Sequence, residues 1–303
     1  MVDITHKQST FRHAIATAIV EVSKEETIDA IRNNRVPKGN IFEFSRAAGL
    51  LAIKNTHMVI PDCHPLPIEF AAIKHEISGL QVIVTVEVST IYKTGVEVEA
   101  MHGASITALT MYDMLKPIDK QVQIGTIKLE QKKGGKSDFN KEVPPGFKAA
   151  VIVCSDSIAA GEKEDKSGLA IISKLKKHGI EVSKYFIIAD NKESIQNNAL
   201  LLSETGFQLA IFTGGTGLSP RDVTPESLQP LIDREIPGVM EAARNYGQQR
   251  TPYAMLSRGV AGFIKDTLVL TLPGSVRGVE ETMDSLFPQL LHVFKVAGGA
   301  RHD

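Results

Sequence analysis

The stretch LAIFTGGTGLSPRDVTPE, Leu209–Glu226, indicates the fold of the second half of the chain. Its first five residues form a short apolar run that is typical of a buried strand, and glycines follow at once. Glycines let backbone N–H groups approach an anion closely, and the N-terminus of a following helix attracts negative charge. The stretch therefore predicts a strand, an anion-binding loop and the start of a helix, in that order.

Three other apolar runs in the second half are predicted strands: AAVIVC (149–154), KYFIIA (184–189) and TLVLTL (267–272). Helices are expected at Ser167–His178, at Glu193–Thr205 and near the end of the chain. Apolar strands that alternate with helices indicate a parallel sheet covered on both faces. The second half is therefore expected to be a doubly wound α/β domain.

Polar residues follow each of these predicted strands. The carboxyl ends of parallel strands meet at one edge of the sheet, where the ligand crevice of such folds lies. The glycine loop suits a phosphate-bearing ligand, and Asp190 with Asp222 suits Mg²⁺, which prefers carboxylate and phosphate oxygens. The alternative is a tight turn at Gly214–Gly217, with Asp222 as the cap of a helix that starts at Thr224. The candidate binding residues at this edge are Ser155, Asp156, Gly214, Gly215, Thr216, Gly217, Ser219, Gly274 and Ser275.

The first half has a different pattern. LPIEFAAIKHEI (66–77) and LQVIVTVEVSTIY (80–92) are typical of paired strands, with a turn at Gly79. Neighbouring strands with helices on one face indicate an α+β sandwich. The other elements expected in this half are helices at Ser45–Asn55 and Val96–Leu115 and a strand at Val122–Leu129.

Lysines, carboxylates and a histidine are distributed through the first half, and together they suit acid–base chemistry on an anionic substrate. Asp113 and Lys116 are three residues apart on a predicted helix and share a face, although an ordinary surface ion pair is the alternative. Glu97 and Glu99 alternatively form a solvated helix start, where the helix dipole favours acids. The candidates are Lys38, Lys54, His64, Glu97, Glu99, Asp113, Lys116, Lys132 and Lys136.

The spacing of two of these acids adds a prediction. Glu99 and Asp113 are fourteen residues apart on one predicted helix. At a rise of 1.5 Å per residue they are about 21 Å apart, which is too far for both to contact one small substrate. If both residues act in catalysis, another subunit must complete the site, so we expect a homo-oligomer with shared active sites.

The segment IPDCHPLPIEF, Ile60–Phe70, places Cys63 next to His64 among three prolines. Neighbouring residues in an extended segment point to opposite sides, so this pair is a poor metal chelate. The prolines restrict the backbone on both sides of the pair. We expect this stiff segment to fix His64 as a hydrogen-bond donor to a substrate phosphate, with Cys63 packed inward.

Composition limits the remaining possibilities. The 303 residues carry a net charge of −1, which argues against a dominant nucleic-acid or membrane surface. Two cysteines make no disulfide framework, the N-terminus lacks an apolar secretory region, and no apolar run reaches about 18 residues, so a cytoplasmic protein is expected. Glycines, prolines and charges interrupt the apolar pattern at 137–147, the expected linker between domains 1–136 and 148–303.

Motifs of the first half resemble the MoaC family, the cyclic pyranopterin monophosphate synthases of molybdenum-cofactor biosynthesis. They are KGNIF, DCHPL, KTGVEVEA, ALTMYDMLK and KKGGKS, with MVDIT and TFRHA at the start, over about residues 1–136. The resemblance implies a ferredoxin-like fold in a hexamer. It also implies conversion of (8S)-3',8-cyclo-7,8-dihydroguanosine 5'-triphosphate to cyclic pyranopterin monophosphate and pyrophosphate. It assigns general acid–base catalysis to Asp113 and Lys116, and substrate contacts to Lys38, His64, Glu97, Glu99 and Lys132, with Arg12 and Lys54 as further candidates.

Two positions depart from the MoaC pattern. Asn40 stands where that family usually has Asp, and Asp62 stands where it usually has Leu. Asn40 keeps a polar side chain without the charge, and Asp62 adds a charge beside Cys63 and His64. Both departures are expected to bear on substrate affinity more than on the chemistry.

Motifs of the second half resemble the molybdopterin-binding MoaB/MogA family over about residues 148–296. They are TGGTGLSPRDVTPE, SDS and DKSG upstream of it, and LSRGVAG and LPGS downstream. The resemblance implies a molybdopterin adenylyltransferase, in which Mg-ATP and molybdopterin give adenylylated molybdopterin and pyrophosphate. The two catalytic aspartates of the family fall on Asp190 and Asp222. Some MoaB members lack the first aspartate and are inactive, so its presence here favours activity.

Together the resemblances imply a bifunctional enzyme for an early and a late step of one pathway. The expected ligands are a GTP-derived triphosphate, molybdopterin as a substrate, ATP, and Mg²⁺ at the C-terminal site. We expect no tightly bound cofactor and no nucleic-acid or membrane partner. The expected assembly is a homotrimer or hexamer with interface active sites in the N-terminal domain. The alternatives are a C-terminal half that binds pterin or oligomerises without turnover, and an N-terminal half made inactive by Asn40 and Asp62.

Overall fold

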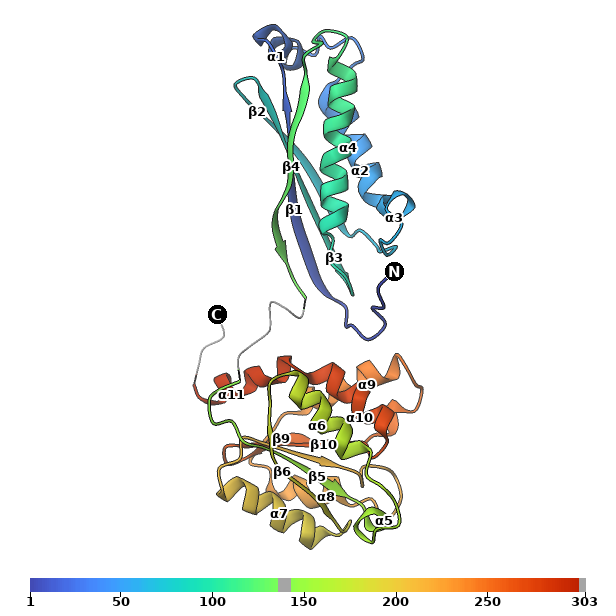
Figure 1. Cartoon of the computed structure of the whole chain (residues 1–303), viewed down its shortest axis with the longest axis vertical. Coiled ribbons are helices and arrows are strands. Elements are labelled where there is room, and N and C mark those ends of the chain that lie inside the picture. Colours follow the sequence, from blue (N-terminus) through green and yellow to red (C-terminus); the bar gives the residue numbers. More distant parts are fainter. Residues whose placement is uncertain (136–142, 300–303) are drawn as a thin grey trace. The chain divides into compact units, whose positions relative to one another are not determined.

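The computed structural model describes residues 1–135 and 143–299 of the chain, which divides into two compact units, Met1–Asp138 and Phe139–Asp303 (Figure 1). Each unit has its own hydrophobic core. The expected linker at 137–147 lies in part outside the described residues, as does the candidate Lys136. In the described ranges, no helix combines the length and the apolar character that a bilayer span requires.

Unit 1 is a four-stranded antiparallel sheet in the order β2-β3-β1-β4, with α2 and α4 packed on one face (Figure 1). The chain order and the strand order are those of the ferredoxin-like βαββαβ fold, which confirms the predicted fold class. Its elements are β1 (Thr10–Glu21), α1 (Glu25–Arg32), α2 (Ile41–Lys54), α3 (Thr56–Val59), β2 (Phe70–Ser78), β3 (Gln81–Tyr92), α4 (Glu97–Leu115) and β4 (Gln123–Lys133).

The two long helices of unit 1 touch each other and the sheet through small residues. A side chain on Gly103 of α4 would lie 2.5 Å from Ile53 Cγ1 of α2, so only glycine permits this approach. The inward positions of β1, such as Ala14, Ala16 and Ala18, are also small and fully buried. The start of α2 lies near the end of α4, so the two helices run antiparallel (Figure 1).

Several elements of unit 1 differ from the expectations. Helix α2 begins at Ile41 rather than Ser45, because the Asn40 side chain caps it by accepting hydrogen bonds from the N–H groups of Phe42 (3.1 Å) and Glu43 (3.2 Å). Strand β1 and helix α1 were not predicted from the sequence. Gly79 lies in the turn between β2 and β3, as predicted, with a φ of 57°.

Unit 2 is a six-stranded sheet in the order β6-β5-β7-β10-β9-β8 with helices on both faces (Figure 1). The predicted α/β class is confirmed. Its strands are β5 (Ala149–Cys154), β6 (Val182–Ile188), β7 (Leu209–Thr213), β8 (Arg234–Glu235), β9 (Ala261–Ile264) and β10 (Thr267–Leu272). Its helices are α5 (Asp156–Ala159), α6 (Ser167–Lys177), α7 (Lys192–Glu204), α8 (Thr224–Leu228), α9 (Pro237–Gln248), α10 (Val276–Leu286) and α11 (His292–Ala297).

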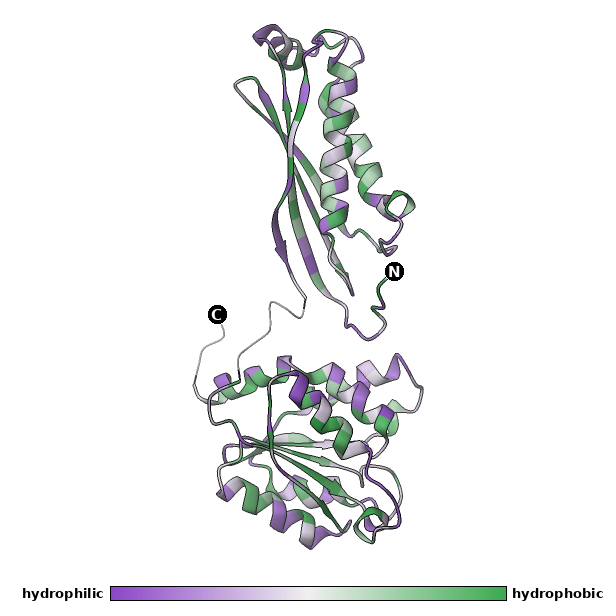
Figure 2. Ribbon diagram, viewed as in Figure 1, coloured by the Kyte–Doolittle hydropathy of each residue, from purple (hydrophilic) through white to green (hydrophobic). Residues whose placement is uncertain are grey.

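The sheet of unit 2 is only partly parallel. Strands β6, β5, β7 and β10 are parallel, whereas β9 and β8 join them as an antiparallel edge that the apolar pattern did not predict. Every residue of β5, β7 and β10 is buried, and Figure 2 shows these strands as apolar between helices with polar outer faces. The four parallel strands still end at one edge of the sheet, and this edge carries the candidate site.

Candidate functional site

A cavity of about 430 Å³ lies at the carboxyl ends of the parallel strands of unit 2. It brings together three acids from three different segments, Asp156, Asp190 and Asp222, as the sequence predicted. Two cations also line it: Arg221, which belongs to the glycine-loop motif, and Lys163, which the sequence did not single out. The predicted residues Ser155, Gly214, Gly215, Ser219 and Gly274 line the same cavity.

Asp190 is held against the glycine loop. Its backbone N–H donates to Asp156 Oδ1 at 2.9 Å, and a side chain on Gly215 would lie 2.7 Å from Asp190 Oδ1. Burial, together with the charges of Asp156 and Asp222, raises the pKa of Asp190 to about 6. Asp190 Oδ1 is buried and accepts no hydrogen bond from the described residues. An oxygen without a donor and an excess of negative charge both suit a cation at this position.

The acids of this cavity would bind a divalent metal only together with oxygens from a ligand or water. Within residues 1–135 and 143–299, no group of three or more His, Cys, Asp or Glu side chains is arranged to hold a metal ion. Mg²⁺ is commonly held by one or two carboxylates together with water and the phosphates of a substrate. Asp190 and Asp222 fit that arrangement, in which the phosphorylated ligand brings the other oxygens.

Asp222 stabilises a turn in the glycine loop and does not cap a helix. Its Oδ2 accepts from the Ser219 N–H at 2.8 Å, and its own N–H donates to the Ser219 carbonyl at 2.9 Å. Helix α8 starts after Val223 without a side-chain cap. The alternative role of Asp222 as the helix cap is therefore wrong, because its carboxylate folds back over the loop.

Arg258 holds this loop from outside the sequence segment that forms it. Its Nε donates to the Gly217 carbonyl at 2.7 Å, its Nη2 donates to the Asp222 carbonyl at 2.8 Å, and its Nη1 pairs with Glu226. Both ends of the segment 217–222 are thus tied to one guanidinium group. Sequence reasoning missed this role, although Arg258 stands in the motif LSRGVAG that was noted downstream of the loop.

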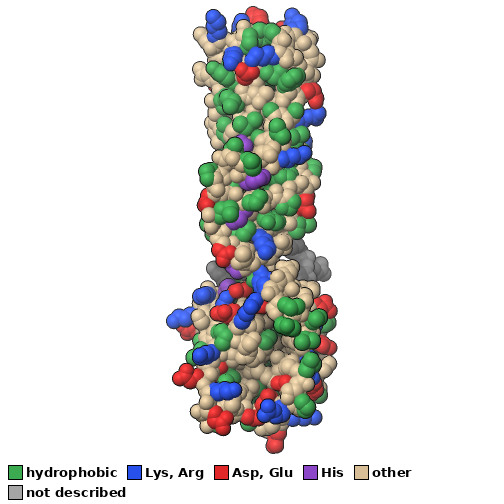
Figure 3. Space-filling model, turned by 90° about the vertical axis from the view of Figure 1, so that its right-hand side faces the viewer, with side chains coloured by type: hydrophobic (Ala, Val, Ile, Leu, Met, Phe, Trp, Pro, Cys, Tyr) green, Lys and Arg blue, Asp and Glu red, His purple; other side chains and the backbone are tan. Residues whose placement is uncertain are grey.

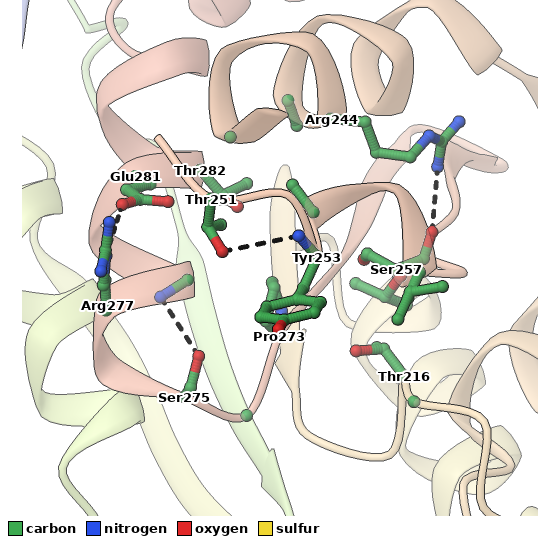
Figure 4. Close-up of a pocket in the computed structure, with 18 of the residues that line it drawn as sticks. Thr216, Arg244, Thr251, Tyr253, Ser257, Pro273, Ser275, Arg277, Glu281 and Thr282 are labelled. Carbon is green, nitrogen blue, oxygen red and sulfur yellow. Dashed lines mark hydrogen bonds and ion pairs between the residues drawn. The ribbon is translucent and has the colours of Figure 1, made fainter. Parts of the chain in front are cut away.

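A second cavity, of about 520 Å³, lies beside the first and shares Gly215, Asp222 and Gly274 with it (Figure 4). The predicted residues Thr216, Gly217 and Ser275 line this second cavity rather than the acidic one. Ser275 also caps α10, because its Oγ accepts from the Gly278 N–H at 3.2 Å. The candidate site of unit 2 therefore has two compartments that meet at the glycine loop.

In unit 1 the candidate residues form two clusters. In the first, Asp113 accepts from both Lys38 (2.6 Å) and Lys116 (2.8 Å). Hydrogen bonds from Lys116 and Lys38 lower the pKa of Asp113 to about 2, and Asp113 raises the pKa of Lys116. An ordinary ion pair on a helix surface would involve only Asp113 and Lys116. Here Lys38, which precedes α2 in the chain, also pairs with Asp113.

The second cluster lies at the first turn of α4. Glu97 pairs with Lys132 at 3.3 Å, and the Cys63 thiol donates to Glu99 Oε1 at 3.5 Å. Glu99 is 3% exposed, and this burial raises its pKa. Burial, followed by the charge of Glu99, raises the pKa of Cys63 to about 11. Glu99 is thus no solvated helix start, and the thiol beside it is held in its protonated form.

The remaining candidates of unit 1 are placed as follows. His64 Nε2 donates to the Val2 carbonyl at 2.9 Å, and Cys63 is half-buried rather than packed fully inward. Asp62 pairs with the amino group of Met1 at 2.6 Å, which lowers the pKa of Asp62. Lys54 lies in the last turn of α2. Arg12 donates to the carbonyls of Tyr92 (3.2 Å) and Lys93 (3.4 Å).

The two clusters of unit 1 do not meet within one chain. Asp113 lies in the last two turns of the 19-residue helix α4, and Glu99 lies in its first turn (Figure 1). The rise of an α-helix keeps them about 21 Å apart. The structure therefore joins Lys38 and Lys116 to Asp113 at one end of α4, and joins Cys63 to Glu99 at the other.

Comparison with known proteins assigns both halves. A MoaC family model matches residues 1–135, and a model described as "Probable molybdopterin binding domain" matches residues 150–292. The chain is 37% identical over 302 residues to the molybdenum cofactor biosynthesis bifunctional protein of Chlorobaculum tepidum, covering 100% of this chain and 96% of that protein.

Each half also matches separate proteins. The first half is 46% identical over 143 residues to the cyclic pyranopterin monophosphate synthase of Clostridium perfringens, covering 46% of this chain and 90% of that protein. The crystal structure of the molybdopterin biosynthesis enzyme MoaB from Thermus thermophilus is 39% identical, with a TM-score of 0.48, and covers 52% of this chain and 99% of that one. With a full-length match beside a family match for each half, the chain belongs to the family of molybdenum cofactor biosynthesis bifunctional proteins.

Proposed function

We propose that the chain catalyses two reactions of molybdenum-cofactor biosynthesis, one in each unit. Unit 1 converts (8S)-3',8-cyclo-7,8-dihydroguanosine 5'-triphosphate to cyclic pyranopterin monophosphate and pyrophosphate. Unit 2 adenylylates molybdopterin: a phosphate oxygen of molybdopterin bonds to the α-phosphorus of ATP while the bond to the β-phosphate breaks and pyrophosphate leaves. The family of the whole chain and the charged clusters in each unit support this assignment.

The observation that carries the proposal for unit 1 is the shared contact of Lys38 and Lys116 with Asp113. The ionised Asp113 raises the pKa of Lys116 and so keeps it protonated, and Lys116 is therefore ready to act as a general acid. The two ammonium groups also attract a triphosphate. His64, on its proline-rich segment, is a further donor to a substrate phosphate.

The test of this role separates chemistry from stability. Lys116→Ala should lower the turnover of unit 1 by at least about 100-fold, because a positioned general acid contributes about 10²- to 10⁴-fold. The melting temperature should not change, because exposed ion pairs contribute little. Glu43→Gln is the matched control, since Glu43 and Arg46 form an exposed i,i+3 pair at 2.7 Å on α2. Equal activity in the two variants would contradict the role.

We propose further that a second copy of the chain completes the site of unit 1. Helix α4 carries an exposed apolar stripe that includes Val98, Met101, Leu109 and Tyr112, and α2 adds Phe44 and Leu51. Figure 3 looks onto this helical side of unit 1 and shows apolar side chains spread over it. Burial of such a surface against another copy is favourable. A two-fold related copy with an antiparallel α4 would set the Asp113 end of one chain beside the Glu99 end of the other.

For unit 2, the observation that supports adenylyl transfer is the acidic cluster with two cations around it. Lys163 and Arg221 suit the charge of a triphosphate, and the glycine loop offers backbone N–H groups. Asp190 and Asp222 would hold Mg²⁺, which when bound neutralises charge on the phosphates of ATP. The positions of these side chains then align the phosphate oxygen of molybdopterin with the α-phosphorus.

The test for unit 2 is pyrophosphate release from ATP in the presence of molybdopterin. Asp222→Asn should abolish it, because that change removes a charge from the proposed metal site while keeping the acceptor oxygen that receives the Ser219 N–H. If the unmodified protein binds molybdopterin but releases no pyrophosphate, unit 2 is a binding module and not a transferase.

A further inference from the structure

The larger cavity of unit 2 has more apolar residues in its wall than the acidic cavity has. Its wall includes Met240, Leu256 and Pro273, and its volume of about 520 Å³ is in the range of pockets that take a small organic ligand. It opens toward the glycine loop through the residues it shares with the acidic cavity. A ligand with a flat ring in this cavity would thus have its phosphate end near Asp222.

One carboxylate lies in this cavity away from the glycine loop. Figure 4 shows Glu281 and Thr216 on opposite sides of the pocket, with Pro273 and Tyr253 between them. The Glu281 side chain is 16% exposed, and its Oε1 accepts from Arg277 Nε at 2.8 Å. Its Oε2 accepts no hydrogen bond from the described residues. Oε2 of Glu281 is therefore available to accept a hydrogen bond from a ligand, although the side chain is largely shielded from solvent.

The ion pair with Arg277 does not by itself explain this placement. An i,i+4 ion pair on a helix surface contributes little to stability and does not require its carboxylate to be shielded from solvent. Glu281 is the shielded member of the pair, while Arg277 is 69% exposed. Arg277 fixes the orientation of the carboxylate, and Arg277 is itself anchored by a hydrogen bond from its Nη2 to the Arg250 carbonyl at 3.1 Å.

The chemistry of a pterin ring matches such a carboxylate. A pterin has a 2-amino group next to an N3–H in a 2-amino-4-oxopyrimidine ring, so two parallel donors lie on one edge. An ionised carboxylate has two acceptor oxygens and no donor, and charge-assisted bidentate contacts are the strongest of this type. We infer that Glu281 selects the ligand of this cavity by accepting hydrogen bonds from the amino edge of a pterin. This inference rests on the proposed function, in which unit 2 takes molybdopterin.

The experiment measures binding of molybdopterin to the full chain and to two variants. Glu281→Gln should weaken binding at least tenfold, because an amide offers one acceptor and one donor where two acceptors are needed. Glu280→Gln, one residue earlier on the exposed side of α10, is the matched control and should bind like the unmodified protein. Melting temperatures establish that both variants are folded.

Competition between two probes tests the hydrogen-bond pattern itself. Pterin and lumazine share a bicyclic ring, but lumazine has an oxo group in place of the 2-amino group. The unmodified protein should prefer pterin by at least tenfold as a competitor of molybdopterin. Glu281→Gln should reverse the preference, because the glutamine amide can accept from N3–H and donate to the 2-oxo group.

The outcomes separate the inference from the function on which it rests. If the unmodified protein does not bind molybdopterin, the proposed function of unit 2 is wrong. If it binds molybdopterin but does not distinguish pterin from lumazine, or if Glu281→Gln behaves like Glu280→Gln, the inference is overturned and the function stands. If Glu281→Gln does not fold, the preference of the unmodified protein for pterin over lumazine decides whether the inference holds.

Discussion

Glu99 and Asp113 lie at opposite ends of one helix, α4, and each has its own set of partners there. Asp113 is ionised between two lysines, whereas Glu99 is buried beside a thiol and has a raised pKa. The two acids thus differ in chemistry as well as in position. One chain therefore cannot bring both acids to a single small substrate, whereas the proposed two-fold pairing of antiparallel α4 helices would do so.

This arrangement predicts complementation between two inactive variants. In a two-fold dimer of Glu99→Gln with Lys116→Ala, one site carries both changes and the other carries neither. The mixed dimer should therefore have about half of the activity of the unmodified dimer, because one of its two sites is intact. Co-expression of the two variants with different affinity tags, followed by purification through both tags, isolates the mixed species for an assay of pyrophosphate release.

The control for complementation is each variant expressed alone. Both should be inactive in the assay of unit 1, and melting temperatures establish that both are folded. A mixed species as inactive as its parents would contradict a shared site, since a site contained in one chain cannot be restored by mixing.

Asp190 should reduce the stability of unit 2 at neutral pH. Its pKa is raised to about 6 in the folded protein, above the usual value of about 3.9, so the folded state binds more protons between about pH 4 and 6. Stability is therefore lost as the pH rises through that range. Asp190→Asn should raise the unfolding free energy by about 1–2 kcal/mol above pH 6, after allowance for solvent screening of a part-exposed group, and by little near pH 4.

Calorimetry of the full chain in buffer with a chelator measures this effect. Asp266→Asn is the matched control, because Asp266 is an exposed acid at the β9–β10 turn, away from the acidic cavity. The same gain at pH 4 and pH 7.5 for Asp190→Asn would contradict an electrostatic origin.

Asn40 should act as a helix cap rather than as a substrate ligand. Its side chain accepts from two N–H groups at the start of α2, a role that Asp fills equally well. Asn40→Ala should therefore lower the stability of unit 1 by about 1 kcal/mol, and Asn40→Asp should change it by only a few tenths. Thermal unfolding of the full chain checks both values, and a change in KM of more than tenfold for Asn40→Asp would show that the lost charge matters for the substrate.

Arg258 should position Asp222 for the reaction of unit 2. A lysine has one ammonium group in place of the planar fork and cannot hold both Gly217 and Asp222 carbonyls in the same geometry. Arg258→Lys should lower kcat/KM for adenylyl transfer at least about tenfold, since small displacements of positioning groups are costly. Arg234→Lys is the control, because Arg234 donates to the Lys265 carbonyl at 3.0 Å on another loop. Equal losses in both variants would indicate general destabilisation instead.

The fold could be predicted where the pattern is local. Helix α4 and strand β3 have long, regular apolar patterns, and their observed bounds agree closely with the expected ones. Strand β1 was missed because its inward positions are largely alanine, which favours helix and signals burial weakly. The antiparallel edge was missed because β8 and β9 are only two and four residues long.

The candidate site residues could be predicted where they directly follow a predicted strand or share one face of a predicted helix. Asp190 and the glycine loop follow predicted strands, so their convergence was expected from topology alone. Lys163, Arg221 and Arg258 lie in loops, and their contacts depend on how distant segments pack. The same holds for Lys38, whose contact with Asp113 requires α2 and α4 to run antiparallel.

The central claim is that one chain has two independent active sites. Its most direct test measures pyrophosphate release by the full chain, first with the cyclised dihydro-GTP triphosphate and then with molybdopterin and Mg-ATP. The unmodified protein should release pyrophosphate in both assays, Lys116→Ala should lose only the first activity, and Asp222→Ala should lose only the second. Release in one assay alone by the unmodified protein, or loss of both activities in either variant while it remains folded, would contradict the account.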